Sequence, residues 1–416
     1  MTEERFVVVG ASVGGLTAAQ ELRKLTDAEI VIVDGDPDAP YDKTALSKAA
    51  LIQDEIPGIR ICTPEKLHDH GITLRSGLSA TGLDPRRKVV ALHDGTELAY
   101  GKLLVAAGAS PMVPFPVGVG TPLHVLRTLA DARALRTALR RESPHLAVIG
   151  SGLVGCEVAS AGRDLGVPTT LISADPGPFS AVLGTGVAAF IEQIQRESGL
   201  TAIYGARVRG VGTDSKSGRY QVELGNDTAI SADVIVAGTG VKPSTAWLEG
   251  SGIVFARGIL CDTRFQTSIP DVYAIGDIVC WPGGPFGELL QLEHWTVAAD
   301  QGAYVSQVMV TGDPLPGAAL PLPYFSTQLH GHRMMSIGFP RVAEQYLEFR
   351  DHAGKGKLLV LYAKHDRLIG ALTFNSPALL ARFTPMIEER IAWTEALSAA
   401  AEAMPDAISP MVGAAP

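Results

Sequence analysis

Two glycine-rich strand–turn–helix segments constrain this sequence more than any other feature. Residues 5–25 read RFVVVGASVGGLTAAQELRKL, and residues 145–160 read HLAVIGSGLVGCEVAS. In each segment an apolar strand ends at a glycine (Gly10, Gly150) and a helix follows. Such a turn presents backbone N–H groups and the positive end of a helix to one point, which suits the pyrophosphate of a dinucleotide. We therefore expect two dinucleotide sites in one chain.

Each segment also opens a longer block with the same order of elements. The first block continues with a strand at 28–34, a hairpin around Asp94-Gly95 and a buried strand that reaches Gly108. The second continues with a strand at 168–173 and then repeats the hairpin and the last strand over 220–241. This duplication predicts an α/β fold with two doubly wound, Rossmann-like domains.

The rest of the chain changes in texture. The stretch 283–310 is expected to be helical. From about residue 321 the pattern alternates as in strands, and two helices are expected near the end, which together predict a C-terminal α+β domain. The last residues, DAISPMVGAAP, are expected to fray.

Composition excludes several classes of protein. The 416 residues carry a formal net charge of −9, which argues against a nucleic-acid partner. No apolar run is long enough to cross a membrane, and the N-terminus lacks the pattern of a signal peptide. The four cysteines are far apart and form no metal-ligand spacing, so we expect reduced thiols, no metal and a cytoplasmic location.

The polar residues near the two turns suggest how the nucleotides are held. Ser12 stands at the second glycine position of the first loop, where its hydroxyl could reach a phosphate oxygen. Asp34, with Asp36 as a rival, stands where an acid holds ribose hydroxyls. The second block has Ser173 at this place and Asp175 two residues later, with no Lys or Arg in 173–178, which favours NADH over NADPH. Two sites of this kind indicate a resident flavin and a visiting nicotinamide nucleotide.

Five further stretches complete a recognisable pattern: PYDKTALSK (40–48), LLVAAGASP (103–111), LRTLADA (126–132), VYAIGDI (272–278) and EHWT (293–296). Together with the two loops they resemble the oxygenase-coupled NADH-dependent ferredoxin reductases over nearly the whole chain. The resemblance implies the fold of glutathione reductase. It divides the chain into an FAD-binding domain (1–112 and 242–320), an NAD(P)H-binding domain (113–241) and a C-terminal α+β domain (321–416).

The same resemblance implies the residues of each site. Those expected at FAD are Gly10, Ser12, Gly14, Gly15, Asp34, Asp36, Lys43, Lys48, Arg127, Asp277, Glu293, His294 and Trp295. Those expected at the nicotinamide nucleotide are Gly150, Gly152, Val154, Gly155, Glu157, Asp175, Gly240 and Ser326.

Lys48 and Glu157 are the implied catalytic pair. Lys48 would lie beside the flavin ring, where a cation stabilises the anionic reduced flavin. Glu157 would contact the nicotinamide region and pair with Lys48. An alternative for Glu157 is a first-turn acid that only complements the dipole of its helix. Asp277 would accept hydrogen bonds from the ribityl chain, and the helix after Glu293 would begin near the flavin pyrimidine.

Missing residues are informative as well. Disulfide reductases of this fold have cysteines after the first βαβ unit, but residues 37–55 contain none. Electrons are therefore expected to leave singly from the flavin edge to an external two-iron ferredoxin that feeds an oxygenase. The alternatives are a rubredoxin, oxygen or quinone reductase of the same fold, or a signalling flavoprotein like apoptosis-inducing factor. A monomer or homodimer is expected.

One stretch departs from the family pattern. Residues 324–331 read YFSTQLHG where the family usually reads YFWSDQYG. Ser326 thus replaces the aromatic residue expected at the nicotinamide pocket, and Gln328 replaces the usual Asp.

Overall fold

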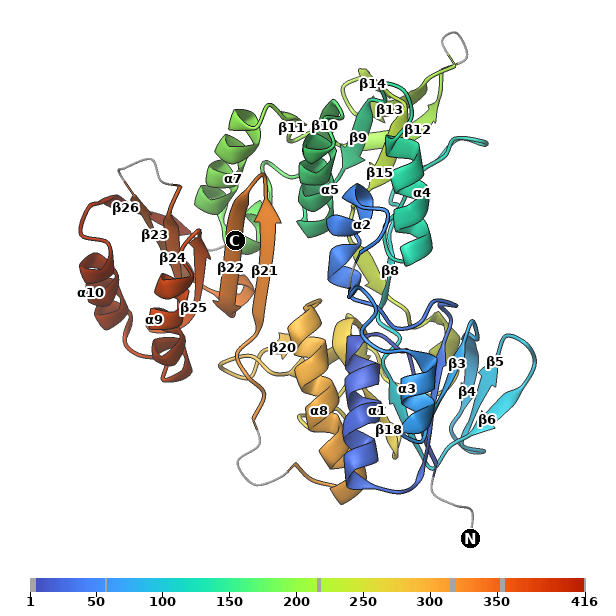
Figure 1. Cartoon of the computed structure of the whole chain (residues 1–416). Coiled ribbons are helices and arrows are strands. Elements are labelled where there is room, and N and C mark those ends of the chain that lie inside the picture. The colour runs from blue at the N-terminus through green and yellow to red at the C-terminus, as the bar shows by residue number, and fades with distance from the viewer. Residues whose placement is uncertain (1–4, 57, 215–217, 315–318, 352–355, 415–416) are drawn as a thin grey trace. The chain divides into compact units, whose positions relative to one another are not determined.

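The computed structural model describes residues 5–56, 58–214, 218–314, 319–351 and 356–414 (Figure 1). The chain separates into two compact units. The first unit consists of 1–44, 56–110 and 241–323, and the second of 45–55, 111–240 and 324–416. None of the helices in the described ranges combines the length and the apolar character that crossing a bilayer requires.

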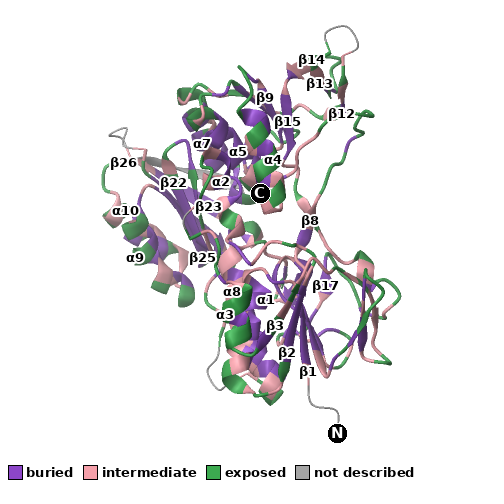
Figure 2. Ribbon diagram, turned by 45° about the vertical axis from the view of Figure 1, so that its right-hand side comes forward, coloured by how far each residue is buried: buried purple, intermediate pink, exposed green. Residues whose placement is uncertain are grey.

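A five-stranded parallel sheet forms the centre of the first unit, in the order β18-β7-β1-β2-β3. Its elements, with the helix that follows β1, are β1 (Arg5–Val9), α1 (Val13–Leu25), β2 (Glu29–Asp34), β3 (Ile72–Ser76), β7 (Lys102–Val105) and β18 (Val272–Ala274). Apart from Arg5, Glu29 and Asp34 at their ends, β1 and β2 are apolar and buried, as Figure 2 shows. The strand order reverses direction at β1, and in such sheets ligands bind beyond the carboxyl ends of the strands at this reversal.

The other elements of the first unit surround this sheet. They are η1 (Lys43–Ala45), α3 (Pro64–Asp69), β4 (Ala80–Asp84), β5 (Val89–Leu92), β6 (Glu97–Ala99), β8 (Ala109–Pro111), β16 (Val241–Pro243), η2 (Ala246–Leu248), β17 (Ile259–Leu260), η3 (Gly276–Ile278), β19 (Val279–Pro282), β20 (Leu289–Leu290) and α8 (Trp295–Thr311). The predicted hairpin around Asp94-Gly95 is the β5–β6 pair. Helix α8 packs against α1 so closely that a Cβ on Gly302 would lie 2.4 Å from the Gly14 carbonyl oxygen.

The start of α8 corrects one expectation. The helix predicted over 283–310 begins only at Trp295. The residues before it form β20 and irregular backbone, because Gly283, Gly284, Pro285 and Gly287 are poor helix formers.

The second unit contains the second parallel sheet, in the order β11-β10-β9-β15. Its elements are α2 (Ala49–Ile52), α4 (Leu129–Leu139), β9 (Leu146–Ile149), α5 (Leu153–Asp164), β10 (Thr169–Ile172), α6 (Ser180–Leu183), α7 (Thr185–Glu197), β11 (Thr201–Ile203), β12 (Val208–Thr213), β13 (Tyr220–Leu224), β14 (Ala229–Ala232) and β15 (Val234–Ala237). Strand β9 pairs in parallel with both β10 and β15. The block that starts at Gly150 therefore repeats the arrangement around β1, and the predicted pair of Rossmann-like folds is confirmed.

The second unit also contains a six-stranded antiparallel sheet in the order β21-β22-β25-β24-β23-β26. Its elements and the helices beside it are β21 (Tyr324–Leu329), β22 (His332–Gly338), η4 (Pro340–Val342), β23 (Gln345–Asp351), β24 (Leu358–Lys364), β25 (Arg367–Phe374), α9 (Pro377–Glu388), α10 (Trp393–Ala403) and β26 (Ala407–Ala414). The expectation that the last residues fray was wrong for 407–414, because backbone pairing with β23 orders them. Residues 415–416 lie outside the described residues.

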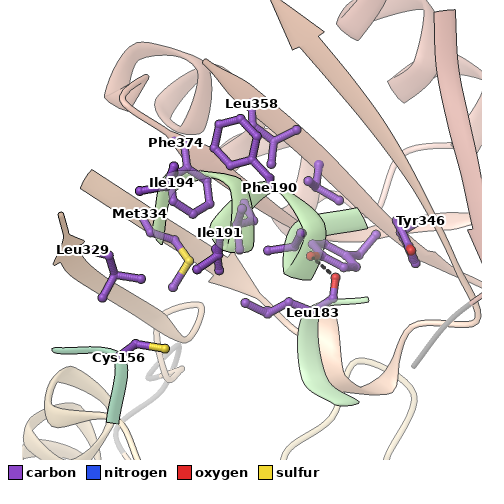
Figure 3. Close-up of a cluster of buried hydrophobic side chains, with 14 of the residues drawn as sticks. Cys156, Leu183, Phe190, Ile191, Ile194, Leu329, Met334, Tyr346, Leu358 and Phe374 are labelled. Carbon is purple, nitrogen blue, oxygen red and sulfur yellow. Dashed lines mark hydrogen bonds between the residues drawn. The ribbon is translucent and has the colours of Figure 1, made fainter. Parts of the chain in front are cut away.

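A buried apolar cluster joins this antiparallel sheet to the nucleotide-binding part of the second unit. Figure 3 shows Phe190, Ile191 and Ile194 of α7 packed among residues of the sheet, including Phe374 and Leu358. The Tyr362 hydroxyl adds a 2.9 Å hydrogen bond to the carbonyl oxygen of Leu183. The sheet and α7 therefore share one core.

Candidate active site

The two glycine loops have nearly the same geometry. Gly10 and Gly150 adopt φ values of +110° and +106°, which side chains rarely adopt. A Cβ on Gly10 would lie 2.3 Å from the Ala106 carbonyl oxygen, and one on Gly150 would lie 2.2 Å from that of Gly238. Each turn is thus packed against the strand that ends beside it, so glycine is required at both positions by the protein itself.

The third position of each loop requires glycine, and the second position does not. A Cβ on Gly15 or Gly155 would lie 1.9 Å from the carbonyl oxygen of the first glycine of its loop. Ser12 and Gly152, at the second position, share one conformation, with φ and ψ of −71° and −177° in Ser12 and −77° and −169° in Gly152. A Cβ on Gly152 would meet no atom within 4 Å.

The acidic side chains near the first loop accept hydrogen bonds from backbone N–H groups. Asp34 accepts the N–H of Ala11 at 2.5 Å and that of Asp36 at 2.8 Å. Asp36 accepts the Tyr41 hydroxyl at 2.6 Å. Lys43 lies with its Nζ 5.7 Å from the centre of the Tyr41 ring. Asp34 thus shapes the turn after β1, a role that the sequence did not reveal.

The second loop is closed by two serines. Ser151 donates its hydroxyl to that of Ser173 at 2.8 Å, and both side chains are buried. The Ser173 hydroxyl also accepts the N–H of Asp175 at 3.2 Å. Ser173 therefore shapes the loop, and Asp175 is an exposed acid at the end of β10. Val154 lies half-buried in the first turn of α5, and the Gly240 carbonyl accepts the N–H of Met112.

Several residues expected at FAD lie together in the first unit. Asp277 lies in η3, directly after β18, and its carbonyl oxygen accepts the Gln291 amide at 3.1 Å. His294 precedes the first residue of α8, Trp295, and burial lowers the His294 pKa to about 4, partly opposed by Asp277. Glu293 is exposed.

Gln301 is a residue that the sequence reading missed. Its side-chain oxygen accepts the N–H of Gly276 at 2.7 Å, which fixes the turn that carries Asp277. Its Nε2 is buried and has no hydrogen-bond partner among the described residues. This buried donor lies beside the turn that follows β18, an edge strand of the sheet, and it suits a ligand that offers a hydrogen-bond acceptor.

Lys48 and Glu157 lie in the second unit and form an ion pair, as the resemblance implied. The Lys48 Nζ lies 2.9 Å from Glu157 Oε1, and the Glu157 side chain is only 3% exposed. Lys48 directly precedes α2, and Glu157 lies in the second turn of α5. A buried carboxylate that binds a lysine does more than complement a helix dipole.

Two hydroxyls that the sequence reading missed complete this cluster. Thr327 of β21 donates to Glu157 Oε1 at 2.5 Å. Ser47 donates to Glu157 Oε2. The hydroxyls come from residues 110 and 170 positions away from Glu157, so no local pattern could have indicated them.

The remaining predicted residues of the second unit lie as follows. Arg127 is half-buried just before α4, and its backbone N–H donates to Asp131 at 3.0 Å. Ser326 is exposed on β21, and its neighbour Thr327 is buried. Because side chains alternate along a strand, Ser326 faces away from Glu157.

Comparison with known proteins identifies the family. The sequence pattern described as "Pyridine nucleotide-disulphide oxidoreductase" matches residues 4–302. The chain belongs to this family.

Similar proteins match this chain over most of its length. The "Anthranilate 1,2-dioxygenase system ferredoxin--NAD(+) reductase component" of Burkholderia cepacia is 30% identical, over 90% of this chain and 92% of that protein. "Monodehydroascorbate reductase 4, peroxisomal" of Arabidopsis thaliana is 28% identical, over 88% and 78%. The solved structure "Crystal structure of the covalent putidaredoxin reductase-putidaredoxin complex" has a TM-score of 0.87 and 25% identity, covering 94% of both chains. The resemblance read from the sequence is therefore confirmed at the level of family and fold.

This pyridine nucleotide-disulphide oxidoreductase has no disulfide of its own. All four of its cysteines are free and buried. Cys156 donates its thiol to the Ser151 carbonyl at 3.3 Å, and burial raises the Cys156 pKa to about 12. Such a thiol is protonated near neutral pH and is a poor nucleophile.

Proposed function

We propose that the protein is an FAD-dependent NADH:ferredoxin reductase, which passes electrons from NADH to a two-iron ferredoxin that feeds an oxygenase. The ion pair between Lys48 and the buried Glu157 carries this proposal. The family of the chain and the names of its relatives support it.

The first unit suits FAD. The turn at Gly10, with Ser12 and the start of α1, would hold the pyrophosphate, and Asp36 would reach the ribose. The Gln301 Nε2, which has no partner among the described residues, and the turn at Asp277 offer polar groups near the carboxyl end of the same sheet. Bound FAD would supply the ability to take a hydride and release its electrons one at a time.

The second unit suits NADH. The turn at Gly150 and the exposed backbone of Gly152 would hold the pyrophosphate at the start of α5. Asp175 would accept the hydroxyls of the adenine ribose and repel the 2′-phosphate of NADPH.

Lys48 would act through its charge. A cation beside the flavin favours the reduced, anionic form, so it lowers the barrier to hydride transfer. Glu157 would hold that cation in place through the 2.9 Å contact. The positive charge of Lys48 would thus be fixed in position before the reaction begins.

The acceptor is inferred from what the chain lacks and from its relatives. The thiols are buried, so an external one-electron acceptor fits better than a disulfide. Relatives named as ferredoxin reductases support a ferredoxin, and the monodehydroascorbate reductases supply the specific rival, a small organic radical. The four free cysteines support a cytoplasmic location. We propose no nucleic-acid or membrane partner for the protein, and we expect it to be a monomer or homodimer.

Stopped-flow spectroscopy tests both halves of the reaction. The purified protein should release FAD on acid precipitation, and NADH should bleach the flavin faster than NADPH does. The reduced protein is then mixed with a two-iron ferredoxin, rubredoxin, a quinone, oxygen or enzymatically generated monodehydroascorbate. Fastest reoxidation by the ferredoxin is expected. Fastest reoxidation by monodehydroascorbate would replace the proposal, and very slow reduction by NADH would favour a signalling flavoprotein.

A further inference from the structure

We propose that Thr327 is the positioning residue of the Lys48–Glu157 pair, so that the C-terminal sheet controls hydride transfer through a hydroxyl. This inference rests on the proposed reduction of FAD by NADH and is independent of the final electron acceptor.

The contacts at Glu157 carry the argument. Among the described residues, three donors reach its carboxylate, and they come from two separate stretches of chain, residues 47–48 and β21. Thr327 and Lys48 share Oε1, at 2.5 Å and 2.9 Å, while Ser47 binds Oε2. The Glu157 side chain is almost fully buried, so water cannot easily take the place of a lost donor.

Thr327 is suited to hold the Glu157 carboxylate in place and not to take part in the reaction itself. Its side chain is 4% exposed, and a β-branched side chain on a strand has few rotamers. It shares the Glu157 Oε1 atom with Lys48. Loss of the Thr327 hydroxyl would leave Oε1 with fewer donors, and the carboxylate would turn toward those that remain. The ammonium of Lys48, whose side chain is one-third exposed, would follow it.

A second contact fixes the register of β21 against α5. The N–H of His330 donates to the Ser160 hydroxyl at 2.8 Å. His330 lies three residues after Thr327, and Ser160 lies three residues after Glu157, so the two contacts are one helical turn apart. The shared core behind them, which includes Cys156 and Leu329 (Figure 3), stiffens this arrangement. The position of the Thr327 hydroxyl is therefore set by the antiparallel sheet as a whole.

Substitutions at Thr327 separate positioning from stability. Thr327→Val keeps the shape and removes the hydroxyl, and Thr327→Ser restores it. Thr373→Val is the matched control, because Thr373 is a buried threonine of β25 in the same sheet and its hydroxyl has no partner among the described residues. All four proteins are compared by stopped-flow reduction with NADH.

The expected result is a split between rate and binding. Thr327→Val should slow flavin reduction about tenfold, equivalent to ~1.4 kcal/mol, while the Kd for NADH changes less than about twofold. Thr327→Ser should recover most of the rate, and Thr373→Val should leave it unchanged. In a Lys48→Ala background Thr327→Val should have little further effect, because the two residues act through one carboxylate. Equal slowing by Thr373→Val, or additive effects with Lys48→Ala, would overturn the proposal.

A second measurement does not depend on the reaction. The Glu157 side-chain carboxyl resonance is followed by NMR in protein with isotope-labelled glutamate, and Glu157→Gln assigns it. The resonance should move in Thr327→Val and return in Thr327→Ser, and it should stay in place in Thr373→Val. An unmoved resonance would refute the hydrogen bond even if NADH proved not to reduce the flavin. Failure of ferredoxin reduction alone would contradict the proposed function and leave this inference standing.

Discussion

Gly152→Ala is the substitution that best separates what the fold requires from what the ligand requires. A Cβ at this position would meet no atom of the protein within 4 Å. The conformation is not a reason for glycine either, because Ser12 has nearly the same φ and ψ in the first loop. The fold does not require glycine here, so we expect that the close approach of the NADH pyrophosphate does, whereas the Ser12 hydroxyl of the first loop is expected to reach a phosphate oxygen itself.

The expected magnitudes follow from this geometry. The loss of glycine flexibility and the poorer N-cap act in opposite directions, so the free energy of unfolding should change by less than about 1 kcal/mol. A methyl group on the loop would displace the pyrophosphate from one or two backbone N–H groups. Hydrogen bonds to a charged group are worth about 1.5–3 kcal/mol each, so the Kd for NADH should rise at least about tenfold.

The assay compares this variant with Gly155→Ala. A Cβ on Gly155 would lie 1.9 Å from the Gly150 carbonyl oxygen, so this variant should lose stability by about 1–3 kcal/mol or more. Urea unfolding gives the stability, and the dependence of the flavin-reduction rate on NADH concentration gives the Kd. Unchanged NADH affinity in Gly152→Ala would refute the reasoning. A loss of stability as large as that of Gly155→Ala would refute it as well.

Four further predictions address the site and its pH dependence. In steady-state kinetics, wild-type protein should show a higher kcat/KM for NADH than for NADPH. Asp175→Asn should bring the two kcat/KM values closer, because it weakens the repulsion of the 2′-phosphate of NADPH. An unchanged ratio of the two kcat/KM values in this variant would contradict the prediction. Lys48→Ala and Glu157→Ala should each slow flavin reduction, and the double variant should be little slower than either alone, whereas additive losses would argue against a coupled pair. If position 326 lies at the nicotinamide, Ser326→Trp should tighten NADH binding by up to about tenfold. The reduced wild-type protein and the reduced variant are titrated with NAD. Identical dissociation constants and identical long-wavelength absorbance of the two proteins would exclude this position from the nicotinamide pocket. Burial lowers the pKa of His330 from 6.5 to about 4, so the folded chain binds fewer protons than the unfolded chain between these values. Stability should therefore fall as the pH falls through this window, by up to about 1.4 kcal/mol per pH unit, and urea unfolding of His330→Asn should show a shallower fall. An unchanged slope in that variant would assign the effect to other groups.

The two nucleotide-binding folds could be predicted because their signals are local. The turns at Gly10 and Gly150 depend on a few consecutive residues. The strands before them consist mainly of apolar residues, and this composition predicts that they are buried. The Lys48–Glu157 contact was also anticipated, but only through the resemblance of separate motifs to a family. No periodicity in the sequence relates these two positions.

Other features were decided by packing. The strand 407–414 exists because β23 offers an edge for it, and its own composition suggested fraying. The start of α8 was misplaced because its apolar period continues into a stretch that glycine and proline keep irregular.

The sequence by itself determined that this chain has two doubly wound nucleotide-binding folds and an acid, Glu157, near the start of the helix of the second loop. The sequence suggested the first turn for this acid, and the structure places it in the second turn of α5. Only the tertiary structure decided what holds that acid. Thr327 and Ser47 reach Glu157 across 170 and 110 residues, and Ser173 became a partner of Ser151 rather than an open ribose-binding position. The physical reason is that a local pattern specifies which face of an element is buried. The partner of a buried polar group depends on which distant element packs against that face.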